Sequence, residues 1–83
     1  MYILLFDQKF KTDLIKLDKS VRDRILKKVF QLEKYPELGK HLIAIDLWSL
    51  RIGKYRVLYT IKKNELQVLV LTVDHRSKVY EDI

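Results

Sequence analysis

The alternation of hydrophobic and polar residues divides the chain into an opening strand, two helices and a β-rich second half. Residues 2–7 are apolar and β-favouring, which predicts a first strand. In residues 8–17 and again in residues 20–34, apolar side chains recur at helical spacing between charged ones. Ser20 is a good N-cap for the second helix, and Pro36 ends it because proline disfavours the α conformation for the preceding residue. We therefore expect a hairpin of two amphipathic helices.

The second half of the chain has the composition of a sheet. Residues 42–52, 54–62 and 65–73 each predict a strand, with turn residues at Gly53 and at Lys63-Asn64. The last of the three is almost continuously apolar, which is typical of a central strand covered on both faces. The order β-α-α-β-β-β predicts an α+β fold, with an N-terminal strand and a two-helix hairpin packed on one face of an antiparallel sheet.

Strand alternation predicts that basic side chains gather on the other face of this sheet. In two neighbouring strands the apolar residues alternate with Ser49 and Arg51, and then with Lys54 and Arg56. Because the apolar residues must pack against the helices, the basic ones are expected to lie on the opposite face. No acidic residue occurs in the segment 47–63. Such a cluster suits phosphate groups, although a wet face of an antiparallel sheet carries Arg and Lys for ordinary reasons too.

Composition and charge narrow the class of protein. The 83 residues are the size of one domain, which we expect to span residues 1–83. Seventeen Lys and Arg against eleven Asp and Glu give a net charge of +6, which favours nucleic acid or an acidic protein as the partner. The absence of cysteine, with only two histidines, argues against a disulfide scaffold and against a zinc site, so no metal or other cofactor is expected. No signal peptide or membrane span is apparent, and we expect a cytoplasmic protein.

Few residues offer catalytic chemistry. The sequence suggests no Ser/His/Asp arrangement, glycine-rich phosphate loop or telling pair of carboxylates, so any reaction would depend on Arg, Lys, His and Tyr. We expect His41 to be exposed or locally hydrogen-bonded, and Trp48 to lie in the core. Arg76, beside His75 at the end of the last strand, could close one end of the basic face.

Three separated motifs resemble one known family. Residues 47–59 (LWSLRIGKYRVLY) resemble the central signature of the RelE/ParE toxin superfamily, an aromatic residue with Leu-Arg-Val-Gly and then Tyr-Arg-Val-hydrophobic-Tyr. His75-Arg76 followed by Val79-Tyr80 is similar to the C-terminal ending of that family, and residues 36–42 match the segment after its helical hairpin. The motifs occur in the family's order and span nearly the whole chain.

This resemblance implies a toxin of a type II toxin–antitoxin system. RelE-like members enter the ribosomal A site and cut mRNA, ParE-like members inhibit DNA gyrase, and both are neutralised by a small antitoxin. The resemblance therefore implies a metal-independent endoribonuclease, an mRNA interferase that inhibits translation, with the ribosome, mRNA and a small acidic RelB-like antitoxin as partners. The alternatives are a ParE-like gyrase inhibitor without catalytic activity and a degenerate member that only binds its antitoxin.

By position, the resemblance assigns a catalytic role to four residues, namely Arg51, Arg56, Arg76 and Tyr80. We expect the RNA-binding residues to be Lys54, His75, Ser49 and Lys40. Cleavage without a metal requires the 2′-hydroxyl to attack the adjacent phosphate, with one group to remove its proton and others to stabilise the phosphate charge. Arg56 and Arg76 suit the phosphate because guanidinium stays charged, and Arg51 would position the backbone. The resemblance favours Tyr80 as the base, with His75 and Lys54 as alternatives.

Overall fold

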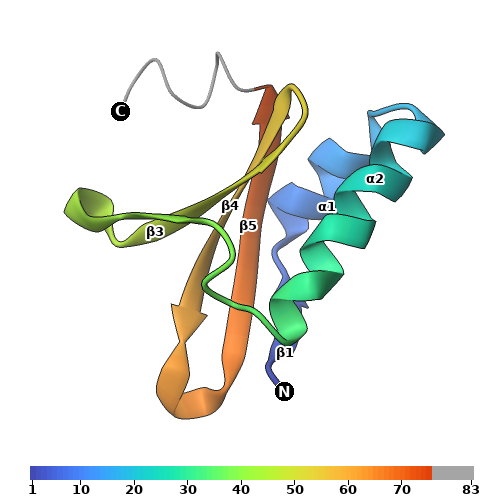
Figure 1. Ribbon diagram of the computed structural model, residues 1–83. Helices are drawn as coiled ribbons and strands as arrows, with labels where there is room; N and C mark the ends of the chain where they lie inside the picture. Colours follow the sequence, from blue (N-terminus) through green and yellow to red (C-terminus); the bar gives the residue numbers. More distant parts are fainter. Residues whose placement is uncertain (76–83) are drawn as a thin grey trace.

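The computed structural model describes residues 1–75, and its helices and strands follow the predicted order with one short strand added (Figure 1). The helices are α1 (Gln8–Ile15) and α2 (Lys19–Val29), and α2 continues into a 3-10 turn at Phe30–Glu33. The strands are β1 (Ile3–Phe6), β2 (Lys40–Leu42), β3 (Leu47–Ile52), β4 (Tyr55–Lys62) and β5 (Gln67–His75). In Figure 1 both helices lie on one side of the sheet, and the turn between β2 and β3 projects away from them.

The α+β class and the helical hairpin on one sheet face are confirmed, and the sheet is mixed rather than purely antiparallel. Its strand order is β1-β5-β4-β3-β2, in which β1 runs parallel to β5 and all other neighbours are antiparallel. Short connections impose an antiparallel direction on β2 to β5. No such connection joins β1 to β5, because both helices and three strands lie between them in the sequence.

The helices begin and end close to the predicted positions. The carboxylate of Asp7 accepts a hydrogen bond from the Lys9 amide at 3.0 Å and so caps α1. Helix α2 begins at Lys19 with Asp18 at its N-cap, slightly before the expected cap at Ser20. Apolar residues of both helices and of three strands form one buried core, which includes Phe10, Leu14, Ile25, Val29, Leu32, Leu50, Ile52, Val57, Tyr59, Val68, Val70 and Val73.

The single strand expected over residues 42–52 is wrong, because the chain turns in the middle of it. Strand β2 ends at Leu42, a 3-10 turn covers Ile43–Ile45, and Asp46 adopts a left-handed conformation with φ of 51° before β3 begins. The misleading signal came from Ile43 and Ile45, whose side chains are 80% and 46% exposed. Apolar residues in a turn mimic the pattern of a buried strand.

A buried tyrosine holds the segment before β2 against the sheet. The Tyr59 hydroxyl donates a hydrogen bond to the Pro36 carbonyl at 2.7 Å and accepts one from the Gly39 amide at 3.0 Å. Gly39 fits closely there, since a Cβ on it would lie 2.6 Å from the Ser49 carbonyl oxygen. Tyr59 is fully buried and therefore fixes where the chain enters β2.

Replacing this hydroxyl tests its contribution to stability. We expect Tyr59→Phe to lower the free energy of unfolding by roughly 1–3 kcal/mol, because a buried amide and a carbonyl lose their partner. Chemical denaturation measures the loss. The matched control is Tyr35→Phe, since Tyr35 is 61% exposed and should tolerate the change within about 0.5 kcal/mol. Equal stabilities of the two variants would contradict the role of Tyr59.

The same residue predicts a loss of stability in alkali. Burial raises the pKa of Tyr59 to about 12, chiefly because the phenolate would be desolvated. The folded state thus retains a proton that the unfolded chain releases near pH 10, so this contribution is complete below about pH 10 and is lost as the pH rises towards 12. Unfolding measured between pH 9 and 12 should show a steeper decline for the wild type than for Tyr59→Phe. Parallel declines would contradict the assignment.

Candidate nucleic-acid interface

The β3–β4 hairpin brings together two of the predicted catalytic residues. Arg51 and Arg56 are direct cross-strand partners, so their side chains project from the same face of the sheet. Their neighbours Leu50, Ile52 and Val57 are buried under the helices, which places both arginines on the opposite face. Arg51 is exposed and Arg56 is half-buried. The predicted pairing of the two arginines on the face away from the helices is confirmed.

Two further basic residues flank this pair. Lys40 in β2 is exposed and pairs with Ser49, the residue two positions before Arg51. Its side chain is therefore on the same face of the sheet as Arg51 and Arg56, which we call the arginine face. Lys54 is exposed and forms the two-residue turn between β3 and β4 with Gly53. Ser49 itself is only 4% exposed, and this burial does not support the expected contact with RNA.

A β-bulge decides which residues of β5 join the face. Leu58 pairs with Thr72 but Tyr59 pairs with Val70, so Leu71 is an extra residue in β5. An extra residue reverses the alternation beyond it. Asp74 consequently pairs with Arg56 and lies in the row Arg51–Arg56–Asp74, a half-buried carboxylate on an otherwise basic face.

The same bulge moves His75 away from the arginines. His75 pairs with Tyr55, and the two rings lie edge to face with centroids 5.9 Å apart. It lines a hollow of about 370 Å³ at the end of α1, together with Asp13, Lys16 and the neighbouring Asp74. The alternation of β5 nevertheless directs the His75 side chain to the helix side of the sheet, opposite to Asp74. The structure therefore does not bring His75 together with Arg51 and Arg56. Arg76 and Tyr80, the other two predicted catalytic residues, lie outside the described residues.

Sequence reasoning missed the contribution of α2 to this basic surface. Lys28 of α2 lines a hollow of about 330 Å³ that also includes Lys40 and Arg51. The Arg24 guanidinium would lie 3.4 Å from a Cβ on Gly53, so it packs over the hairpin turn. In the sequence both are simply charged residues between the apolar positions of an amphipathic helix. Only the packing of α2 beside β3 shows that they extend the basic surface.

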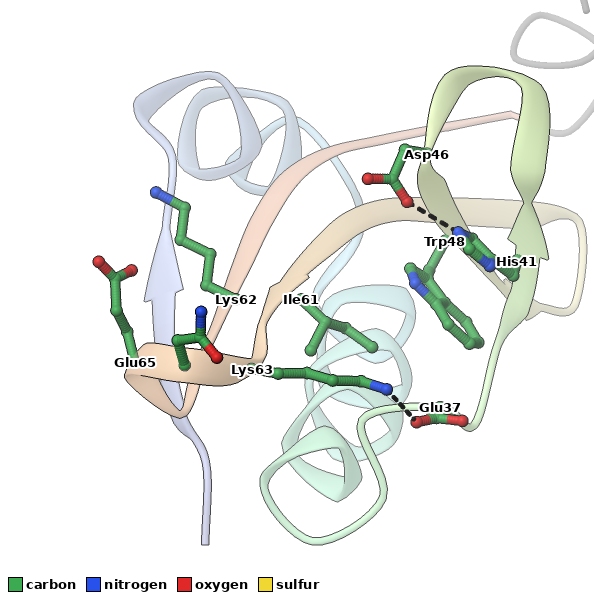
Figure 2. A pocket seen from close by; sticks show the side chains of 9 residues that line it. Glu37, His41, Asp46, Trp48, Ile61, Lys62, Lys63 and Glu65 are labelled. Carbon is green, nitrogen blue, oxygen red and sulfur yellow. Dashed lines mark hydrogen bonds and ion pairs between the residues drawn. The ribbon is translucent and has the colours of Figure 1, made fainter.

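A third hollow lies between the β2–β3 turn and the end of β4, and it is lined by side chains of both charges (Figure 2). The rings of His41 and Trp48 stack with centroids 4.5 Å apart, and His41 Nε2 lies 2.9 Å from the Asp46 carboxylate. Figure 2 shows Lys63 reaching towards Glu37, at an N–O distance of 3.3 Å. The local hydrogen bond expected for His41 is confirmed, and Trp48 packs half-buried against the core. None of the predicted site residues among residues 1–75 lines this hollow.

Residues 1–75 contain neither a metal-binding cluster nor a helix that could cross a membrane. No three His, Asp or Glu side chains among them are arranged to hold a metal ion. Neither helix of this part of the chain has the length and apolar character needed to cross a membrane.

Comparison with known proteins identifies the family. Residues 4–80 match the family model of the ParE toxin of the type II toxin–antitoxin system parDE. A search of curated proteins finds no match.

Solved structures of RelE toxins share the fold. The RelBE2 toxin–antitoxin complex from Mycobacterium tuberculosis contains a chain 33% identical to this one, with a TM-score of 0.81 over 90% of this chain and 98% of that one. The isolated E. coli RelE toxin is 27% identical, with a TM-score of 0.79 over 99% of this chain and 94% of that one. The archaeal RelE–RelB complex from Pyrococcus horikoshii, at 22% identity and a TM-score of 0.78 over 93% and 97%, shows the same fold. The chain therefore belongs to the RelE/ParE superfamily, the toxins of type II toxin–antitoxin systems.

Proposed function

We propose that this toxin is an mRNA interferase that cleaves mRNA on the ribosome. The observation that carries the proposal is the direct cross-strand pair of Arg51 and Arg56 on the sheet face away from the helices. Two guanidinium groups side by side can each grip phosphate oxygens and remain charged at any physiological pH. The similarity to RelE toxins in sequence and fold supports the same reading.

The proposed reaction is attack of a 2′-hydroxyl on the adjacent phosphorus. The new O2′–P bond forms as the bond to the 5′ oxygen breaks, leaving a 2′,3′-cyclic phosphate and a 5′-hydroxyl. Arg56 stabilises the charge that develops on the phosphate oxygens, and Arg51 holds the backbone beside it. Arg76 is proposed to share the first task and Tyr80 to remove the 2′-hydroxyl proton, while the leaving 5′ oxygen takes up a proton from water. The roles of Arg76 and Tyr80 rest on the resemblance of their motif to the family.

Of the four residues expected to contact RNA, we retain Lys40 and Lys54. Both are exposed and flank the arginine pair. His75 lies on the helix side of the sheet, so we do not assign it to the RNA surface. Ser49 lines the hollow shared by Lys40 and Arg51, but it is only 4% exposed and we assign it no contact with RNA.

We also propose that a small acidic antitoxin neutralises the toxin in the cytoplasm. The similar structures from Mycobacterium tuberculosis and Pyrococcus horikoshii are complexes of a RelE toxin with its RelB-type antitoxin. A net charge of +6 and a basic sheet face favour an acidic partner here. Such a partner would mask the arginines and stabilise the folded toxin by mass action.

One observation favours a different target. The matching family model is that of ParE toxins. The ParE-like members of the superfamily that the sequence resembles inhibit DNA gyrase. In that case the arginine face would bind protein or DNA without chemistry of its own. The two functions differ in a measurable product, because only the interferase produces cut mRNA.

Primer extension on an mRNA under translation tests the proposal. We expect the wild type to produce new 5′ ends within the coding sequence, and Arg56→Ala to slow their appearance by about 10²–10³-fold, the usual effect of losing a charge-stabilising donor. Circular dichroism should show that the variant remains folded.

The control is Arg22→Ala, which removes the same charge from a position of α2 that does not line the hollow of Lys28, Lys40 and Arg51. It should cleave at nearly the wild-type rate. A folded Arg56→Ala variant that cleaves as fast as Arg22→Ala would remove Arg56 from the mechanism. Intact mRNA with wild-type toxin, together with inhibited gyrase, would establish the ParE-like alternative.

A further inference from the structure

The outer edge of β3 borders a hollow lined by basic side chains, most of which lie outside the Arg51–Arg56 pair. Its volume is about 330 Å³, and three of its lining residues are basic: Lys28 from α2, Lys40 from β2 and Arg51 from β3. Among the described residues that line it, none carries a carboxylate. Three elements distant in the sequence thus direct positive charge to one place.

This charge has no compensating partner in the described part of the chain. The four ion pairs within residues 1–75 join Lys9 to Asp13, Lys19 to Asp23, His41 to Asp46 and Lys63 to Glu37. None of them involves the three cations of the hollow or Arg24, which packs over the neighbouring turn at Gly53. Like charges repel unless an anion lies between them, so the arrangement is suited to an anionic ligand.

The backbone leaves this edge open as well. Strand β2 is only three residues long and pairs with Leu47, Trp48 and Ser49. Within residues 1–75, no strand pairs with the edge of β3 beyond Ser49. The Tyr59–Gly39 hydrogen bond holds the chain just before β2 and so fixes the mouth of the hollow. A ligand that enters it finds a prepared site rather than a mobile loop.

We propose that this hollow binds a backbone phosphate of RNA next to the phosphate held by Arg51 and Arg56. The inference rests on the proposed function and extends it. Arg51 belongs both to the arginine face and to the hollow. An RNA strand bound at the arginine face would therefore continue over the edge of β3 towards Lys28. Lys28 and Lys40 contact the backbone without regard to base identity, and they position the strand without taking part in the reaction.

Replacement of Lys28 by glutamine tests the site. Lys28→Gln should weaken binding to ribosomes programmed with mRNA roughly fivefold to tenfold, the effect of one lost charge-assisted contact. The slope of log affinity against log salt should fall by about 0.7–1, the effect of one lost phosphate contact. The maximal cleavage rate at saturating toxin should remain unchanged, because Lys28 does not touch the reacting atoms.

Lys27→Gln is the matched control, since Lys27 is the preceding residue of the same helix, is exposed and does not line the hollow. It should retain wild-type affinity and salt dependence. Binding is measured with mRNA that carries 2′-deoxy nucleotides in the A-site codon, which cannot be cleaved, and with a single-stranded RNA alone. A Lys28 effect in both assays supports the inference. An effect on ribosomes alone would overturn it, because the phosphate would then belong to ribosomal RNA and not to the RNA strand held by the arginine pair.

Equal affinity of the Lys28→Gln and Lys27→Gln variants would overturn the inference while leaving the proposed function intact. A Lys28 effect confined to an acidic antitoxin would overturn it too, because the hollow would then be a protein-binding site. A different result would contradict the proposed function itself: wild-type toxin would leave cleavable mRNA intact on the same ribosomes.

Discussion

The two-residue turn at Gly53-Lys54 holds β3 and β4 in the register on which the arginine face depends. Gly53 has a φ of 59°, a left-handed conformation that glycine adopts without steric cost and that suits the first position of a type II′ hairpin turn. A slip of one residue would turn one strand over and place Arg51 and Arg56 on opposite faces. Such a slip would also expose Val57, which is fully buried. The hydrophobic core and the proposed RNA site are thus fixed by the same pairing.

Tyr59 links this hairpin to the rest of the basic surface. Its ring lies in the core, and its hydroxyl holds the segment from Pro36 to Gly39 from which β2 starts. Strand β2 carries Lys40 beside Ser49, and the same connection forms one wall of the hollow at Lys28. A hydroxyl group that a buried phenylalanine would lack therefore helps to position Lys40 beside the β3 edge. We expect the loss of this hydroxyl to change the position of Lys40 on the proposed RNA surface as well as to lower stability.

Much of the fold could be predicted from the sequence because its signals are local. Alternation in 47–52 and 54–62 was enough to place Arg51 and Arg56 on one face, and helical spacing was enough to find α1 and α2. The bulge at Leu71 could not be predicted, because that part of the sequence is uniformly apolar and gives no alternation to follow. It exchanges the faces of Asp74 and His75, which explains why His75 was grouped with the arginines. The place of Lys28 depends on the packing of α2 against β3, a contact between distant segments that no local pattern records.

The central claim is that Arg51 and Arg56 act as a unit created by their pairing, in which Arg51 holds the RNA backbone so that Arg56 can reach the reacting phosphate. A double-mutant cycle tests this most directly, with the maximal cleavage rate on programmed ribosomes measured for the wild type, Arg51→Ala, Arg56→Ala and the double variant. Residues that act together give strongly non-additive losses, so the double variant should be scarcely slower than the worse single variant. If the losses instead multiply, so that their free energies add within about 0.5 kcal/mol, the arginines act at independent sites and the account is contradicted.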